Sequence, residues 1–302
     1  MSPGIEVRDL RLRYGRTVAL DGLTFRLDGG KVYGLLGRNG SGKTSLLSVL
    51  AAFRKASGGE VLVGGQNPFE NAAVVRDICF IRDRVDVSDD ERVSAALAYA
   101  RDVRPNWDAA YADKLVNLFR LPLRKSVSAL ARGQRSALGI TLGLATRAPL
   151  TIFDESYLGM DAPSRYAFYD ELLNDYLANP RTIIVSTHLI EEVGSLFEEV
   201  VIIDEGRLVV HEQADALRAR GASVTGPAAD VDRLVGELRT ERDLVVLGEQ
   251  QLGGTKATTV FGQLDEAARS RVRAAGLDLG PVALQDLFVH LTKKPERLEN
   301  SR

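Results

Sequence analysis

The segment from residue 37 to residue 44 is the feature that most constrains how this chain can fold. It fits the phosphate-binding pattern G-x-x-x-x-G-K-[ST] at every fixed position, with the residues Gly37, Arg38, Asn39, Gly40, Ser41, Gly42, Lys43 and Thr44. A short apolar run at 32–36 precedes the pattern, and leucines at helical spacing follow it from Lys43 to Phe53. A turn between a strand and a helix directs backbone N–H groups and the positive end of the helix at one point. The segment therefore predicts a site for a nucleotide phosphate.

The residue types in this segment predict how ATP and Mg²⁺ are held. Glycine at positions 37, 40 and 42 lets the backbone approach the phosphates, because no Cβ stands between them. We expect Lys43 to reach the terminal phosphates and the Thr44 hydroxyl to bind Mg²⁺. The alternative is a glycine-rich turn without a ligand, and the complete match between a strand and a helix favours the phosphate site.

Composition narrows the class of protein. The chain has 302 residues, which is enough for one large domain and a small one. A net charge of -2 gives no reason to expect nucleic acid or an anionic membrane surface as an electrostatic partner. The single cysteine, Cys79, allows no internal disulfide and is more typical of a small core residue than of a reactive thiol. We expect no signal peptide and no membrane-spanning helix, so that any spanning of a membrane falls to another chain.

Strands and helices alternate along most of the chain, which predicts an α/β fold with a parallel sheet covered on both faces. Alternating runs at 5–12 and 17–27 predict an antiparallel β layer ahead of the phosphate-binding segment. A helical subdomain is expected at about 84–147, where alanine, leucine and arginine dominate. We place this first domain at 1–212.

The remaining residues, 213–302, predict a separate C-terminal accessory or regulatory domain of the α+β class. Its predicted elements follow the order β-α-β-β-α-β, with Gly253 and Gly254 between the two central strands. This order favours a small ferredoxin-like domain.

Two further segments carry candidate catalytic groups. The apolar strand at 150–153 ends in Asp154 and Glu155. We expect Asp154 to hold Mg²⁺ and Glu155 to orient or deprotonate the attacking water, although such acids can also merely cap the next helix. His188 follows a second apolar strand that is expected to end at the same rim, where the imidazole would contact the γ-phosphate. The other histidines, His211 and His290, lack this context and receive no role.

The helix start at 130–134, about twenty residues before the acid pair, completes a set of features that resembles the ATP-binding cassette family, the ATPase subunits of ABC transporters. The resemblance covers residues 5–210 and rests on six landmarks in the order of the family: Tyr14, the 37–44 segment, the turn near Asp83, the 130–134 segment, Asp154-Glu155, and Thr187-His188. The segment Gly159-Met160-Asp161 also resembles the family's loop that touches the partner subunit.

The resemblance implies a mechanism and partners. Two cassettes pack head to tail with two ATP molecules between them, and each phosphate loop faces the other subunit's signature residues, which here are Ala131, Arg132, Gly133 and Gln134. Tyr14 is either a turn residue with a partly exposed ring or a platform for the base. A separate transmembrane permease docks near the helical insertion, which implies a cytoplasmic protein that is peripheral on the inner face of the cell membrane.

Two positions depart from the family pattern. The signature usually has serine where this chain has Ala131, so one hydroxyl donor to the γ-phosphate is missing. The mobile turn usually has glutamine where Asp83 stands. Two interpretations of Asp83 remain open: a ligand of Mg²⁺ or of a water, and a surface acid paired with Arg82 or Arg84.

The leading hypothesis is the ATPase subunit of an ABC exporter. The central segments 106–108 and 186–192 look most like bacterial export-type cassettes that are often encoded beside GntR-type regulators, and the ending at 284–292 is similar to the tail of many exporter ATPases. The alternative is an ATP-binding regulatory or assembly subunit with weak turnover in a heteromeric pair. A soluble cassette ATPase of DNA repair or translation is disfavoured by the single phosphate loop and the absence of sustained heptads, and a P-loop kinase by the 130–134 segment.

Overall fold

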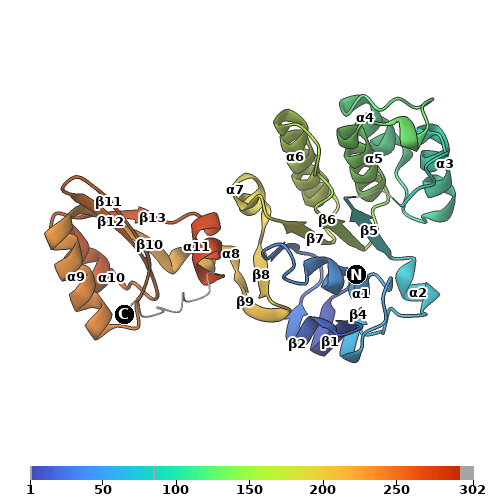
Figure 1. Cartoon of the computed structure of the whole chain (residues 1–302). Helices are drawn as coiled ribbons and strands as arrows, with labels where there is room; N and C mark the ends of the chain where they lie inside the picture. Colours follow the sequence, from blue (N-terminus) through green and yellow to red (C-terminus); the bar gives the residue numbers. More distant parts are fainter. Residues whose placement is uncertain (1, 84–85, 293–302) are drawn as a thin grey trace. The chain divides into compact units, whose positions relative to one another are not determined.

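The computed structural model describes residues 2–83 and 86–292, and it divides after His211 into two compact units. Each unit is described by itself. The larger unit holds two sheets, and the smaller unit holds one (Figure 1).

A three-stranded antiparallel sheet forms one layer of the larger unit. Its order is β2-β1-β4, and its strands are β1 (Ile5–Tyr14), β2 (Thr17–Leu27) and β4 (Gly58–Val63). Gly15 adopts a φ of 57° in the turn between β1 and β2, a conformation that glycine tolerates without strain. The predicted antiparallel layer is therefore confirmed.

A six-stranded sheet forms the second layer, in the order β5-β6-β7-β3-β8-β9. Its strands are β3 (Val32–Leu36), β5 (Ile78–Arg82), β6 (Leu150–Asp154), β7 (Thr182–Thr187), β8 (Glu199–Asp204) and β9 (Arg207–Gln213). The neighbours from β5 to β8 pair in parallel. Strand β9 was not predicted from the sequence, whereas the parallel sheet is confirmed.

Helices cover both faces of the six-stranded sheet. Helix α1 (Lys43–Leu50) buries Leu46, Leu47 and Leu50 in a core shared with the antiparallel layer. On the opposite face Phe153 of β6 packs against Phe168 of α6, with ring centroids 5.3 Å apart. The prediction that α1 runs to Phe53 is wrong at its end. Its C-cap is Ala51, and Ala52 has a φ of 60°, which lies outside the right-handed helical region.

The other described helices of the larger unit are short, belong to the helical insertion or, in one case, form a long helix after the acid pair (Figure 1). They are α2 (Ala72–Val75), α3 (Val93–Val103), α4 (Ala109–Leu118), α5 (Arg132–Ala145), α6 (Ala162–Ala178) and α7 (Ile190–Val193), with 3-10 turns at Val127–Ala129 and Gly194–Leu196. Pro163 lies in the first turn of α6, and Asp161 caps that helix by accepting a hydrogen bond from Ser164 N at 3.0 Å.

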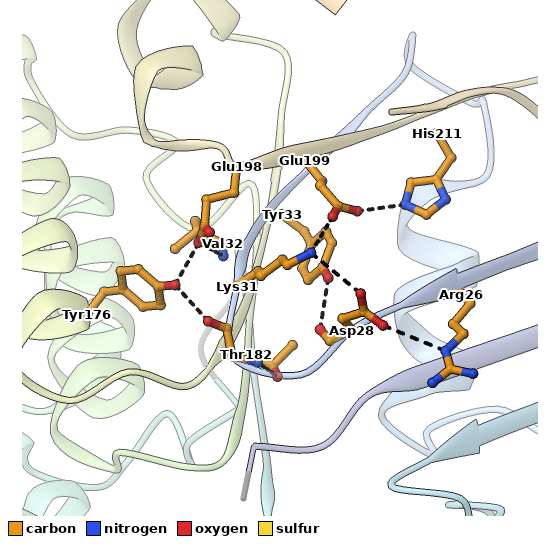
Figure 2. A network of polar contacts seen from close by, with 11 residues as sticks. Arg26, Asp28, Lys31, Val32, Tyr33, Tyr176, Thr182, Glu198, Glu199 and His211 are labelled. Atoms are coloured by element: carbon orange, nitrogen blue, oxygen red, sulfur yellow. Dashed lines mark hydrogen bonds and ion pairs between the residues drawn. The ribbon is translucent and has the colours of Figure 1, made fainter. Parts of the chain in front are cut away.

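A polar network joins elements of the larger unit that are distant in sequence (Figure 2). Glu199 of β8 accepts hydrogen bonds from Lys31 Nζ at 2.7 Å and from His211 Nε2 at 3.0 Å. The neighbouring Glu198 accepts from the Tyr176 hydroxyl of α6 at 2.6 Å. The network ties Glu199 of β8 to the residue before β3 and to β9, and it ties Glu198, the residue before β8, to α6.

The smaller unit contains a four-stranded antiparallel sheet in the order β11-β12-β10-β13. Its elements are α8 (Ala214–Ala219), β10 (Gly221–Pro227), α9 (Ala228–Glu241), β11 (Val245–Leu252), β12 (Thr255–Phe261), α10 (Glu266–Ala274), β13 (Asp278–Pro281) and α11 (Leu284–Leu291). Residues of α9 and α10 share one apolar core with β10 and β12. The predicted order β-α-β-β-α-β is confirmed, and the first strand lies in the sheet between the third and the fourth, as in a ferredoxin-like unit.

Candidate nucleotide-binding site

Sheet register brings the predicted catalytic segments to one edge. Asp154 at the end of β6 is paired in register with Arg82 of β5 and with Ser186 of β7. Leu36, directly before the phosphate-binding segment, is paired with Thr187. Because the carboxyl ends of parallel strands meet at the same edge, the residues that follow these strands gather there.

The phosphate-binding segment has the backbone conformation that requires its glycines. Gly40 and Gly42 have φ angles of 80° and 106°. A Cβ on Gly42 would lie 2.7 Å from the carbonyl oxygen of Ala19, and one on Gly37 would lie 2.6 Å from that of Ile203. The loop is therefore packed against its neighbours at 37 and 42. At Gly40 a Cβ would meet open space, so the constraint there comes from φ alone.

Lys43 is the buried cation of this loop. Its side chain is 6% exposed, and Nζ donates hydrogen bonds to the carbonyl oxygens of Gly37 at 2.7 Å and Arg38 at 3.2 Å. The same Nζ lies 3.7 Å from Glu155 Oε1. The ammonium group is thus held at the point where the loop meets the acid pair.

Asp154 is a buried carboxylate with spare acceptor capacity. Its Oδ1 is buried and accepts no hydrogen bond from any described residue. Burial raises the pKa of Asp154, and the nearby hydroxyls of Thr44 and Ser186 partly oppose this shift. An unsatisfied buried acceptor is costly. A divalent cation would satisfy this acceptor and favour the ionised form, so Thr44 and Asp154 fit the Mg²⁺ expected from the sequence.

An open pocket of about 880 Å³ brings all three predicted metal ligands together. It is lined by Thr44, Arg82, Asp83, Asp86, Val87, Ser88, Asp154 and Glu155. Its chemistry suits Mg²⁺, which binds to few protein oxygens and keeps waters and phosphate oxygens as its other ligands. Among the described residues no compact cluster of three or more His, Cys, Asp or Glu side chains forms an all-protein metal site.

Glu155 has a strained backbone and a shared carboxylate. Its φ is 48°, in the left-handed region that non-glycine residues adopt rarely. Its N–H donates to the carbonyl oxygen of Ser186 at 3.1 Å, and this bond attaches the turn that follows β6 to strand β7. Its Oε1 lies 3.4 Å from His188 Nδ1 as well as near Lys43. Strain of this kind, held in place by neighbouring structure, occurs most often at functional sites.

A buried hydroxyl pair that sequence reasoning missed supports His188. The Tyr157 hydroxyl lies 2.5 Å from Thr187 Oγ1, which also accepts a hydrogen bond from Leu189 N at 2.9 Å. Burial raises the pKa of Tyr157 to about 12, so that this phenol stays protonated. These contacts fix the backbone on both sides of His188. The only signal in the sequence is a tyrosine two residues after the acid pair.

The 131–134 segment opens α5 and lies against the loop that follows the acid pair. Ala131 is the N-cap, and its N–H donates to Gln134 Oε1 at 3.2 Å. A Cβ on Gly133 would lie 2.7 Å from the carbonyl oxygen of Gly159, and Ser136 Oγ donates to that of Leu158 at 2.6 Å. Residues 131–134 do not line the pocket that holds Asp154, among the described part of the chain.

The two residues with open interpretations take specific positions. The Tyr14 ring is 42% exposed, with the Arg54 guanidinium 5.5 Å from its centroid, so one of its faces has a cationic neighbour. Asp83 lines the pocket, while Arg82 pairs with Asp86, with Nε 3.1 Å from Oδ2. Arg84, the other suggested partner of Asp83, lies outside the described residues.

Comparison with known proteins agrees with this geometry. Residues 20–157 match a family model described as ABC transporter. The ATP-binding protein YtrB of Bacillus subtilis is 24% identical over 94% of this chain and 97% of its own length. The daunorubicin resistance ATP-binding protein DrrA3 of Streptomyces coeruleorubidus is 28% identical over 98% of each chain. A solved ATP-binding subunit of an ABC transporter superposes with a TM-score of 0.64 at 23% identity, covering 71% of this chain and 91% of its own.

The larger unit therefore has the P-loop NTPase fold of an ABC ATPase cassette. This fold combines a mixed sheet arrangement with an antiparallel layer and a helical subdomain. The family match and the relatives over nearly the whole chain show that it is similar to ATP-binding subunits of ABC transporters. Among the described residues, no helix is both long enough and apolar enough to span a membrane.

Proposed function

We propose that this chain binds ATP with Mg²⁺ at the pocket beside residues 37–44 and hydrolyses it to drive an ABC transporter. The observation that supports this most directly is that Glu155 Oε1 lies 3.7 Å from Lys43 Nζ and 3.4 Å from His188 Nδ1. A cation for the phosphates, a carboxylate for the water and an imidazole beside that carboxylate are groups suited to phosphoryl transfer to water.

Each residue has a separate role in the proposed hydrolysis. The glycine-rich loop and Lys43 bind and orient the phosphates. Glu155 orients the attacking water and accepts its proton, and His188, with Nδ1 3.4 Å from Glu155 Oε1, holds that carboxylate and contacts the γ-phosphate. Thr44 and Asp154 would hold Mg²⁺, with Asp83 in reach of the same pocket. When bound, the ion neutralises charge on the phosphate oxygens.

We propose that two cassettes share each ATP. Residues 131–134 do not line the pocket within the described part of the chain, which is consistent with their serving the site of a second subunit. The start of α5 would present backbone N–H groups to the γ-phosphate across the dimer. Ala131 cannot supply a hydroxyl, and one hydrogen bond to a charged group is worth roughly 1.5–3 kcal/mol. We therefore expect slower turnover than a serine at this position would give.

The permease partner is proposed to dock on an apolar groove at the helical insertion. This groove, of about 570 Å³, is lined by residues that include Phe53, Phe80, Asp86, Tyr99 and Val103. The side chains of Phe53, Tyr99 and Val103 are 53%, 70% and 49% exposed. Exposed apolar surface of this kind is typical of a protein interface. Docking there would hold the chain at the inner face of the cell membrane as a peripheral cytoplasmic subunit.

Export is the direction that the relatives favour. Relatives named for daunorubicin or doxorubicin resistance and for Nod factor export align with 95–98% of this chain. Relatives named for import of mycobactin and of sulfate or thiosulfate align with 73% and 68%. Residues 213–302 are proposed as an accessory or regulatory domain of an export-type cassette, of the kind encoded beside GntR-type regulators.

The alternative proposal is an ATP-binding regulatory or assembly subunit with weak turnover in a heteromeric pair, which Ala131 and Asp83 favour. Steady-state ATP hydrolysis of the purified chain, alone and reconstituted with a permease encoded beside its gene, separates the two. The leading proposal predicts hydrolysis that the permease stimulates. Nucleotide binding without hydrolysis in either state would instead establish the regulatory subunit.

A further inference from the structure

The side chain of His188 is weakly held at its own end. The imidazole is 42% exposed, and Nδ1 lies 3.4 Å from Glu155 Oε1, which is its one polar contact among the described residues. A contact of this length is longer than an ordinary hydrogen bond, and solvent screens it. The place of the imidazole is therefore set mainly by the backbone of residue 188.

The Tyr157 hydroxyl reaches this backbone from the loop that follows the acid pair. The Tyr157 side chain is buried, and its hydroxyl lies 2.5 Å from the buried Oγ1 of Thr187. The same Oγ1 accepts a hydrogen bond from Leu189 N at 2.9 Å. Burial raises the pKa of Tyr157, and the Thr187 hydroxyl and the N–H groups of His188 and Leu189 oppose this shift. The phenol oxygen therefore lies beside both peptide groups of His188.

A second anchor holds the segment that follows His188. Arg165 of α6 donates to both carboxylate oxygens of Glu192 in α7, from Nε at 2.8 Å and from Nη2 at 2.6 Å. Its Nη1 donates to the carbonyl oxygen of Met160 at 3.0 Å. A bidentate pair of this kind fixes geometry as well as adding binding energy. Because this anchor does not involve Tyr157, loss of the Tyr157 hydroxyl should loosen only the end of the segment that carries His188.

We propose that Tyr157 is a positioning residue that sets the place of the His188 imidazole beside Glu155. Tyr157 follows Glu155 by two residues, so its hydroxyl joins the loop that carries the carboxylate to the strand end that carries the imidazole. The distance between Glu155 and His188 then depends on one contact between two buried hydroxyls. The proposal rests on the proposed hydrolysis and adds to it a residue that does not line the nucleotide pocket.

Steady-state ATP hydrolysis by a Tyr157→Phe variant of the full chain, in the state in which the wild type hydrolyses, tests the proposal. Phenylalanine keeps the ring, which packs on Tyr169 with centroids 6.2 Å apart. Tyr176→Phe is the matched control, because it also removes a phenol hydroxyl, one that donates to Glu198 at 2.6 Å. Glu198 directly precedes β8, so this contact lies at the amino ends of the parallel strands, opposite the edge that carries Glu155 (Figure 2).

We expect Tyr157→Phe to lower kcat about two- to tenfold, the range of one neutral hydrogen bond. KM for ATP should stay near the wild-type value, because Lys43 and its loop hold the phosphates. Thr187→Val should lower kcat as much as Tyr157→Phe does, and Thr187→Ser, which keeps the hydroxyl, should restore most of that loss. Tyr157→Phe should have no further effect on the residual rate of His188→Ala. Tyr176→Phe should keep the wild-type kcat, as Tyr157→Phe would if Tyr157 had a purely structural role.

Two results would overturn the inference while leaving the proposed function standing. One is a wild-type kcat in Tyr157→Phe, and the other is an equal loss from Tyr157→Phe with and without His188. A wild-type chain that hydrolyses no ATP, alone or with the permease, would instead remove the proposed function, and the inference with it.

Discussion

Replacement of Lys43 by alanine is the perturbation whose size follows most directly from the structure. Lys43 Nζ now donates to two loop carbonyls, those of Gly37 and Arg38, and lies near Glu155. Bound phosphates would take the place of the carbonyls as acceptors. A hydrogen bond to a charged group is worth about 1.5–3 kcal/mol, so two phosphate contacts contribute about 3–6 kcal/mol. Lys43 gives up its two hydrogen bonds to loop carbonyls when it binds the phosphates, so its net contribution to the free energy of ATP binding lies near the lower limit of this range.

We therefore expect Lys43→Ala to weaken ATP binding by about 10²- to 10³-fold, since each 1.4 kcal/mol is a factor of ten. Isothermal titration calorimetry with Mg²⁺ and ATP measures this change. Lys31→Ala is the control, because Lys31 pairs with Glu199 in the network of Figure 2 and not with the phosphate-binding loop. An unchanged dissociation constant in Lys43→Ala, with the variant folded, would refute the assignment of the loop as the nucleotide site.

Three further predictions concern stability and the domain division. Burial raises the pKa of Asp154 in the folded state above its usual 3.8. As the pH rises, the unfolded chain therefore loses this proton at a lower pH than the folded chain does. The free energy of unfolding falls over that pH range. Without nucleotide, Asp154→Asn should therefore be more stable than the wild type to urea at pH 7, by a margin that shrinks toward pH 4; a margin independent of pH would contradict this. Gly143→Ala should lower the free energy of unfolding by about 1–3 kcal/mol, because its Cβ would lie 2.6 Å from the Phe153 ring. Gly236 is the control, because it is exposed in α9 and a Cβ there meets open space. Gly236→Ala should raise the free energy of unfolding of the protein by about 0.5–1 kcal/mol. Equal changes in the free energy of unfolding for the two variants would show that the side chains around residue 143 are not tightly packed. Deletion of residues 214–302 should leave ATP affinity unchanged in calorimetry, and loss of folding in the remainder would show that the two units are not independent.

Local patterns in the sequence were enough to predict most elements of the fold. The strands that lead to residue 37 and to Asp154 are short apolar runs with acids or glycines at their ends, and both were found where expected. Strand β9 was not predicted from the sequence, because Arg207–Gln213 mixes partly buried and exposed residues and includes two charged side chains and a histidine. Its position next to β8 depends on pairing at the sheet edge, which no pattern within seven residues encodes.

The site was predictable in its composition but not in its contacts. The motif at 37–44 and the acid pair identify which residues to expect, because their spacing is local. The sharing of Glu155 Oε1 between Lys43 and His188 depends on parallel register between strands more than a hundred residues apart. The pairing of Arg82 with Asp86 also had no signal in the sequence, which left Asp83 open as a ligand of Mg²⁺ or of a water, or as a surface acid paired with Arg82 or Arg84.

Hydrolysis by a Glu155→Gln variant tests the central claim most directly. The chain offers a matched control, because β8 ends at Asp204 and is followed by Glu205, as β6 ends at Asp154 and is followed by Glu155, and Glu205 has a φ of 47°. Steady-state phosphate release should fall by about 10²- to 10⁴-fold in Glu155→Gln, the range of a lost general base, while ATP still binds. Glu205→Gln should hydrolyse ATP at the wild-type rate. Equal rates in Glu155→Gln and the wild type would contradict the assignment of Glu155 and with it the proposed site.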